Sequence, residues 1–185
     1  MPRSGAEARA RLREAALSLY EERGYDATTT AQIAEKAGVT ERTYFRHFAD
    51  KREVLFDGET QLRDVMTAAI ASAPLELSPA ALVMSAYAAA IPLFVAGRPV
   101  AERRARIIAT STALQERAHA KLAALTQAVI DALGERGIPE PTARLAARAG
   151  AAVLERASHA WDGTSAADLQ LLLNEAASEL RALSW

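Results

Sequence analysis

Between Thr28 and Lys51 the chain places charged and hydroxyl side chains at spacings that a short helix would present together. The exposed face of such a helix would carry Thr40, Glu41, Arg42 and Arg46. A guanidinium group donates two hydrogen bonds to O6 and N7 of guanine, and a carboxylate accepts one from N4 of cytosine. These residue types therefore predict contacts to base edges in the major groove of DNA.

Neighbouring polar residues would face phosphates rather than bases. Thr29 and Thr30 stand at the start of a short apolar segment, where a threonine caps a helix and free N–H groups suit anions. Thr43, His47 and Lys51 follow where the duplex backbone would pass. Taken alone, each of these side chains is more often an ordinary solvated group, so the prediction rests on their placement together.

The elements that position these residues are short helices with clear boundaries. A first helix is predicted over residues 5–23, with a stop at Gly24. Two short helices follow, the second over residues 41 to 47 or 48, joined by a turn that contains Gly38; this is a helix-turn-helix unit. A longer helix is predicted over residues 51–72. The inward-facing residues of the two short helices are Ile33, Ala34, Ala37, Val39, Tyr44 and Phe48.

Beyond a linker bracketed by Pro74 and Pro79, helical apolar spacing recurs and no strand pattern appears. Alanine, the strongest helix former, dominates the apolar content. The expected fold is all-α with about nine helices: an N-terminal three-helix DNA-binding domain and a C-terminal helical domain. The later helices are predicted roughly over 80–96, 100–110, 113–135, 141–162 and 165–183, separated by residues 97–99, 134–141 and 162–164.

Composition excludes several chemistries. The chain has no cysteine and three histidines, hence no disulfide, thiolate nucleophile or cysteine metal site. No glycine-rich phosphate loop or clustered catalytic motif is recognisable. We expect no enzyme, catalytic residue, metal or cofactor. No signal peptide or membrane span is apparent, which indicates a cytoplasmic protein. The net charge is −1, with +1 over residues 1–55 and −2 over the remainder, an asymmetry of the right sign for DNA binding but small.

The N-terminal segment resembles the DNA-binding domain of the TetR family of bacterial regulators. The resemblance rests on Ile33–Thr40, on Tyr44–Phe48 and on Lys51 and Leu55, which follow the family pattern without a gap. It implies domains over residues 1–50, for DNA binding, and 51–185, for ligand binding and dimerisation, with the helix over 51–72 as connector.

The family's roles transfer to matching positions of this chain. Thr43 and His47 match positions that contact the DNA backbone, Lys51 matches the phosphate clamp, and Arg42 and Arg46 fall near the bases.

One position departs from the family pattern. Phe45 stands where many members carry a phosphate-binding tyrosine, with Tyr44 one residue earlier. A phenyl ring donates no hydrogen bond, so Phe45 is expected to contact sugar or a thymine methyl. Ala31 likewise offers no hydrogen bond where some relatives read a base.

The last two predicted helices suggest a dimer interface. Members of the family pair through their final two helices, and here these carry small residues and a leucine stripe. A homodimer suits a palindromic operator. The alternative is that these stripes serve only the core of one chain. The predicted interface residues are Ala146, Gly150, Val153, Leu169, Leu173 and Leu180.

Apolar residues of the middle helices suggest a small-molecule site, although each is individually more often plain core. Residues 106–114 resemble, more loosely, a branch of the family with a C-terminal domain like that of the mycofactocin-system regulator, which implies an acyl-CoA-type ligand. The predicted ligand-binding residues are Met84, Tyr87, Ile91, Phe94, Arg106, Ile107, Leu122 and Trp161.

These observations predict a ligand-responsive regulator of transcription. Its partners would be a double-stranded operator, a second copy of the chain and a small hydrophobic or acyl-type effector that releases the repressor by moving the connector helix. The alternatives are a transcriptional activator and a helical protein-interaction module without DNA binding. An interaction module would explain the helices but not the ordered polar residues of 28–51.

Overall fold

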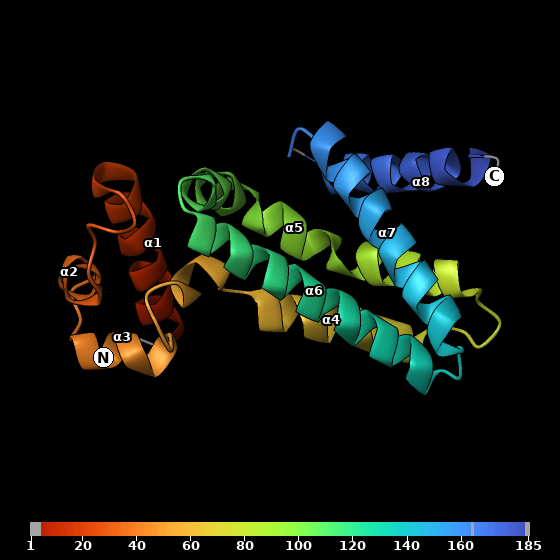
Figure 1. Ribbon diagram of the computed structural model, residues 1–185, viewed down its shortest axis with the longest axis horizontal. Helices are drawn as coiled ribbons and strands as arrows, with labels where there is room; N and C mark the ends of the chain where they lie inside the picture. The colour runs from red at the N-terminus through yellow and green to blue at the C-terminus, as the bar shows by residue number, and fades with distance from the viewer. Residues whose placement is uncertain (1–4, 164, 184–185) are drawn as a thin grey trace. The chain divides into compact units, whose positions relative to one another are not determined.

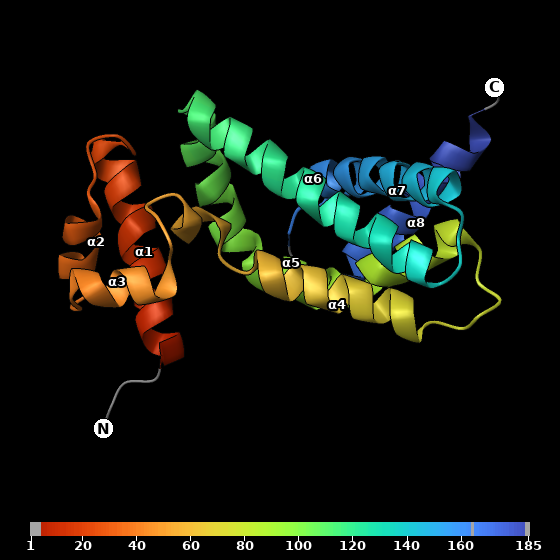
Figure 2. The same cartoon turned by 60° about the horizontal axis from the view of Figure 1, so that its bottom comes forward.

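The computed structural model describes residues 5–163 and 165–183. All regular secondary structure in these ranges is helical. Figures 1 and 2 show the helices from two sides. The predicted all-α fold is confirmed, with eight α-helices and one 3-10 turn in the described ranges; residue 164, in a predicted break, lies outside them. The elements are α1 (Gly5–Arg23), α2 (Thr30–Lys36), α3 (Glu41–His47), η1 (Glu53–Phe56), α4 (Glu59–Ser72), α5 (Pro79–Ala109), α6 (Thr112–Glu135), α7 (Glu140–Ala160) and α8 (Ala166–Ala182).

The chain folds into two compact units, each with its own buried core. The N-terminal unit comprises the residues up to 58 together with residues 99–119, and the second unit comprises residues 59–98 and those from 120 onward. Helices α5 and α6 therefore contribute to both units, and the chain passes between the units three times. The functional division at residue 50 stays a prediction.

Side-chain caps define the two short helices of the N-terminal unit. The Thr29 side chain accepts a hydrogen bond from the backbone N–H of Gln32, whose side chain accepts one from the N–H of Thr29, forming a capping box. Thr40 caps α3 by accepting from the N–H of Thr43. Between the helices, Gly38 has a φ of +66°, which favours glycine. The predicted helix-turn-helix is confirmed.

The core of the N-terminal unit draws on all its helices. Leu12 of α1, Ile33 of α2 and Tyr44 of α3 are fully buried in it. Ile107, near the end of α5, and Leu114, near the start of α6, join the same core. The end of α5 and the start of α6, residues 99–119, are therefore a structural part of this unit.

The helix predicted over residues 51–72 is wrong at its N-terminal end. Gly58 has a φ of +96°, and α4 begins only at Glu59. Before it, η1 places Val54–Phe56 in the N-terminal core, where all three residues are buried. An α-helix spreads consecutive side chains around its axis. Burial of three in a row therefore favours a short turn enclosed by the core over the first turns of a surface helix.

The break predicted at Gly97 to Pro99 is also wrong, because α5 continues through it. Gly97 does not adopt a left-handed conformation, and Pro99 removes only one backbone donor. Apolar burial continues on both sides: Ile91 lies in the second core and Ile107 in the N-terminal core. Among the described helices, α5 alone is long and apolar enough to span a membrane, and its buried residues belong to the two protein cores.

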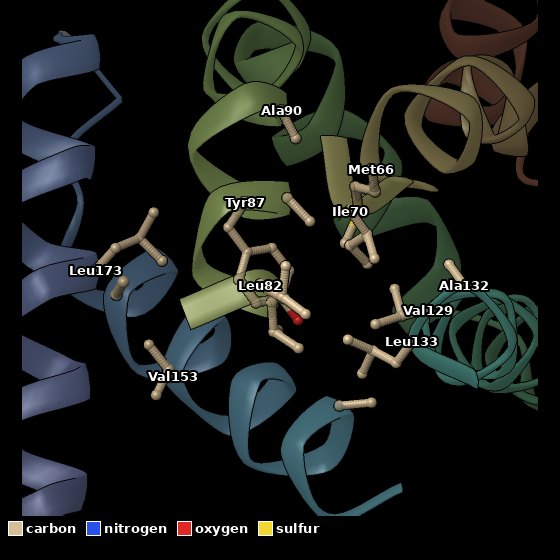
Figure 3. Close-up of a cluster of buried hydrophobic side chains, with 14 of the residues drawn as sticks. Met66, Ile70, Leu82, Tyr87, Ala90, Val129, Ala132, Leu133, Val153 and Leu173 are labelled. Carbon is tan, nitrogen blue, oxygen red and sulfur yellow. The ribbon is translucent and has the colours of Figure 1, made fainter. Parts of the chain in front are cut away.

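The second unit is a helical assembly in which α4 to α8 share one core. Met66 and Ile70 of α4, Tyr87 of α5, Leu133 of α6 and Leu173 of α8 are all buried there (Figure 3). Burial raises the pKa of Tyr87 to about 12. This unit therefore contains the large apolar interior from which a small-molecule site would have to be built.

Candidate DNA-binding surface

The outer face of α3 carries the residues predicted to read bases. Thr40, Glu41, Arg42, Phe45 and Arg46 are all exposed, and Phe45 keeps 51% of its surface accessible. Neither of the two arginines forms a hydrogen bond or ion pair with another residue that the structure describes. The opposite face of the helix packs into the N-terminal core. The helix thus presents two unpaired guanidinium groups and an aromatic ring to solvent.

Three arginines of α1, Arg9, Arg11 and Arg13, bind other groups of the N-terminal unit. Arg9 and Arg13 form ion pairs with the carboxylate of Asp57, at 2.7 and 3.3 Å. Arg11 donates to the backbone carbonyl of Ala37, 2.8 Å away, at the end of α2. These three side chains hold the unit together, which separates them from the unpaired arginines of α3.

A side-chain hydrogen bond links α2 to α3 on the exposed face. The hydroxyl of Thr30 donates to Oε1 of Glu41 at 2.5 Å. The hydroxyls of Thr40 and Thr43 lie 3.0 Å apart. The first turns of both helices are therefore fixed by side chains as well as by backbone bonds.

Lys51 lies at the junction of several segments. Its ammonium donates to the backbone carbonyls of Tyr25 and Thr28, at 2.8 and 2.9 Å, and lies 4.0 Å from the centre of the Tyr25 ring. Its own carbonyl accepts hydrogen bonds from the hydroxyls of Tyr20, at 2.8 Å, and Tyr44, at 3.4 Å. Burial lowers the pKa of Lys51. The residue therefore joins the loop after α1 to the loop after α3, a role that sequence reasoning missed because its partners are backbone atoms.

His47, the last residue of α3, is half-buried. Burial, together with the positive charges of Arg46 and Arg9, lowers its pKa, while Asp57 acts in the opposite direction. Its Nε2 is buried and has no hydrogen-bond partner among the described residues. These surroundings disfavour the charged ring, and a nearby anion would act in the opposite direction. Its contact with phosphate stays a prediction.

The same segment is recognised by comparison with known families. Residues 12–57 match the family model described as "Bacterial regulatory proteins, tetR family". Over these residues, the chain carries a DNA-binding segment of the TetR type. The resemblance inferred from the sequence is confirmed. The looser resemblance of residues 106–114 to the mycofactocin-system branch stays a prediction.

Two relatives match parts of this chain. It is 37% identical over 76 residues to the HTH-type transcriptional regulator TcmR of Streptomyces glaucescens, covering 41% of this chain and 34% of that protein. It is 52% identical over 42 residues to the uncharacterized HTH-type transcriptional regulator YvkB of Bacillus subtilis (strain 168), covering 23% and 22%. The matched segments span about a third and about a fifth of these relatives. Both are described as regulators, in line with the expectation that the chain is not an enzyme.

Solved structures share the fold over nearly the whole chain. A TetR-family protein of Mesorhizobium loti MAFF303099 superposes with a TM-score of 0.59 at 19% identity, covering 97% of this chain and 98% of the other. The fatty acid degradation regulator FadR of Bacillus halodurans gives 0.59 at 17% identity, covering 95% of each chain. The complex of SmeT, from Stenotrophomonas maltophilia, with triclosan gives 0.56 at 20% identity, covering 93% and 90%.

The residues predicted to bind a ligand are only partly brought together. Five of them lie in or against the core of the second unit: Met84, Tyr87, Ile91, Phe94 and Trp161. Ile107 is buried in the N-terminal core instead, so the structure does not bring it together with these five, and its ligand role stays a prediction. Arg106 and Leu122 are exposed, Leu122 to 56%. The apolar stripe on α5 was visible in the sequence, but the point where it passes from one core to the other was not.

Most of the predicted dimer-interface residues are buried within one chain. Val153, Leu169 and Leu173 belong to the core of the second unit, Gly150 is buried on α7, and Ala146 and Leu180 are half-buried against the core. The burial of these four residues favours the alternative of an intrachain core, and their role in an interface stays a prediction. The exposed leucines at the C-terminal end of the chain are Leu145 on α7, Leu171 on α8 and Leu183 after it, which are 71%, 56% and 57% exposed.

Proposed function

We propose that the chain is a transcriptional repressor that binds an operator duplex as a homodimer and leaves it when a small molecule binds the second unit. The carrying observation is the outer face of α3, where Arg42 and Arg46 are exposed and unpaired among the described residues. Such guanidinium groups can contact guanine without first breaking an ion pair. SmeT, which shares the fold, is described as the repressor of a multidrug efflux pump. A regulator of this kind would act in the cytoplasm.

Fluorescence anisotropy on duplexes from upstream of its own gene and of the neighbouring genes tests this proposal. We expect salt-dependent binding with a preference for one duplex. Arg42→Ala or Arg46→Ala should weaken binding to that duplex by about 1–3 kcal/mol and relax the base preference. Arg63→Ala, which removes an exposed arginine of α4 paired with Asp64, is the matched control. Absence of salt-dependent binding to every one of these duplexes would overturn the proposal.

The dimer that we propose forms through the outer faces of α7 and α8. The supporting observation is that Leu145 and Leu171 are mostly exposed, although large apolar side chains are usually buried. A two-fold dimer presents one α3 helix to each half-site of a palindrome, about one helical turn apart.

The effector that we propose is small and hydrophobic, with an acyl chain as one form. Tyr87 and Trp161 are buried in the core of the second unit, and Met84 and Phe94 pack half-buried against that core, so together they supply apolar and aromatic surface. SmeT, which is known in complex with triclosan, and the fatty acid degradation regulator FadR share this fold. Triclosan and a long-chain acyl-CoA are therefore the first compounds to titrate against the protein–DNA complex.

Coupling between effector and operator would use the chain segments shared by the two units. The chain passes from the N-terminal unit to the second unit just before α4, and both α5 and α6 contribute residues to each unit. An effector that favours the non-binding conformer by about 3 kcal/mol would lower operator affinity about 150-fold. The expected result is loss of anisotropy as the effector is added.

A further inference from the structure

The hydrogen bond between Thr30 and Glu41 lies on the surface that carries the proposed function. We infer that these two residues select cytosine at one position of each operator half-site. In this inference Glu41 contacts the base, and Thr30 is the positioning residue that holds its carboxylate. The inference rests on the proposed DNA binding and goes beyond it by naming a base.

Both side chains are held at the start of a helix. Thr30 is the first residue of α2, directly after its cap Thr29, and Glu41 is the first residue of α3, directly after its cap Thr40. The Thr30 hydroxyl donates to Oε1 of Glu41 at 2.5 Å. Glu41 is exposed, and its second oxygen, Oε2, has no hydrogen-bond partner among the described residues. The carboxylate is therefore oriented by one oxygen and open at the other.

An ionised carboxylate accepts hydrogen bonds and donates none. In the major groove cytosine presents the N4 donor, whereas guanine presents only the acceptors O6 and N7 and thymine the acceptor O4 beside a methyl group. Adenine presents the N6 donor next to the N7 acceptor, so it satisfies a carboxylate only in part. The open oxygen of Glu41 consequently favours cytosine over the other three bases.

The charge of Glu41 gives a second reason to expect a base contact. A carboxylate near the phosphates repels a polyanion, so it weakens binding to every duplex unless a base donor offsets the repulsion. The carboxylate of Glu41, which precedes Arg42, is exposed and is held by Thr30. It would therefore weaken binding to duplexes that lack cytosine at this position.

Selection of binding sites from randomised duplexes by the full chain tests the inference. The wild-type protein should enrich cytosine at a fixed position of each half-site, by about 5- to 150-fold over a mismatched base. Glu41→Gln should move the preference toward adenine, because an amide pairs with both N6 and N7 of that base. Thr30→Val should reduce the preference for cytosine, and Thr30→Ser, which keeps the hydroxyl, should restore it.

A matched variant separates base reading from charge. Glu35→Gln removes one negative charge from the exposed surface of α2 and should leave the selected base unchanged. An unaltered site for Glu41→Gln would overturn the inference while operator binding stood. Full cytosine preference in Thr30→Val would overturn the positioning role. If the wild-type protein enriched no sequence at all, the proposed function itself would fail.

Discussion

Gly150 of α7 lies so close to Val83 of α5 that a Cβ at position 150 would stand 2.3 Å from Cγ1 of Val83. It would also lie 3.2 Å from Cε2 of Tyr87. Both neighbours are buried and have little room to yield. We expect Gly150→Ala to lower the free energy of unfolding by about 1–3 kcal/mol through overpacking. Urea denaturation followed by circular dichroism measures the change.

Gly97 of α5 provides the control for this packing effect. It is helical, and nothing stands within 4 Å of a Cβ built there. Gly97→Ala should therefore raise the free energy of unfolding by about 0.5–1 kcal/mol, since alanine is the better helix former. Equal effects of the two substitutions would show that α5 and α7 do not approach as described.

Lys51 is expected to contribute mainly to the stability of the fold and, in addition, to DNA binding. Lys51→Met removes the hydrogen bonds to the carbonyls of Tyr25 and Thr28 but keeps most of the apolar stem. Leaving these acceptors without the ammonium should lower the free energy of unfolding by about 1–3 kcal/mol. Thermal unfolding gives this value, and the salt dependence of anisotropy gives the number of phosphate contacts. An unchanged stability with a salt slope reduced by about one would instead assign Lys51 to phosphate alone.

Much of the N-terminal unit could be predicted from the sequence because its signals are local. A capping threonine before α2, which the structure shows to be Thr29, and the turn glycine at 38 act within a few residues, so both could be expected from the local sequence. The start of α4 and the continuity of α5 depend instead on which core buries Phe56 and Ile107. That choice involves residues distant in sequence, which a periodic pattern does not reveal.

The candidate site likewise has some features that the sequence could predict and others that it could not. Exposure of Arg42 and Arg46 follows from helical periodicity, which was enough to place them on the outer face of α3. The bond between Thr30 and Glu41 joins residues from two helices, so it required the geometry of the turn. The burial of Leu173 could not be decided, because an apolar stripe looks the same whether it faces its own core or a second chain.

The two leucines Leu171 and Leu173 distinguish interface from core. Leu173 is fully buried and Leu171 is 56% exposed, although both lie on α8. Leu171→Glu should yield monomers in sedimentation velocity and retain the helical circular dichroism spectrum. Leu173→Glu should unfold the second unit, because a charge without a partner is strongly disfavoured in a core. A Leu171→Glu protein that still sediments as a dimer would contradict the proposed interface.

His47 should give folding and DNA binding opposite responses to pH. Its pKa in the folded, DNA-free protein is lowered by burial and by the charges of Arg46 and Arg9. Its contribution to stability is therefore present above the unfolded-state pKa of about 6.5 and is lost as the pH falls through the folded-state value. A phosphate beside the ring would raise the pKa, so DNA binding would take up a proton and strengthen as the pH falls.

The experiment compares the wild-type protein with His47→Gln between about pH 7.5 and pH 5.5, the interval around the histidine pKa. Wild-type stability should decrease toward low pH while operator affinity increases, and His47→Gln should reduce both slopes because glutamine does not titrate. His119→Gln, which removes an exposed histidine of α6, should behave like the wild type. If His47→Gln kept the full pH dependence of affinity, proton uptake would have to occur at another group, and His47 would be a packing residue at the end of α3.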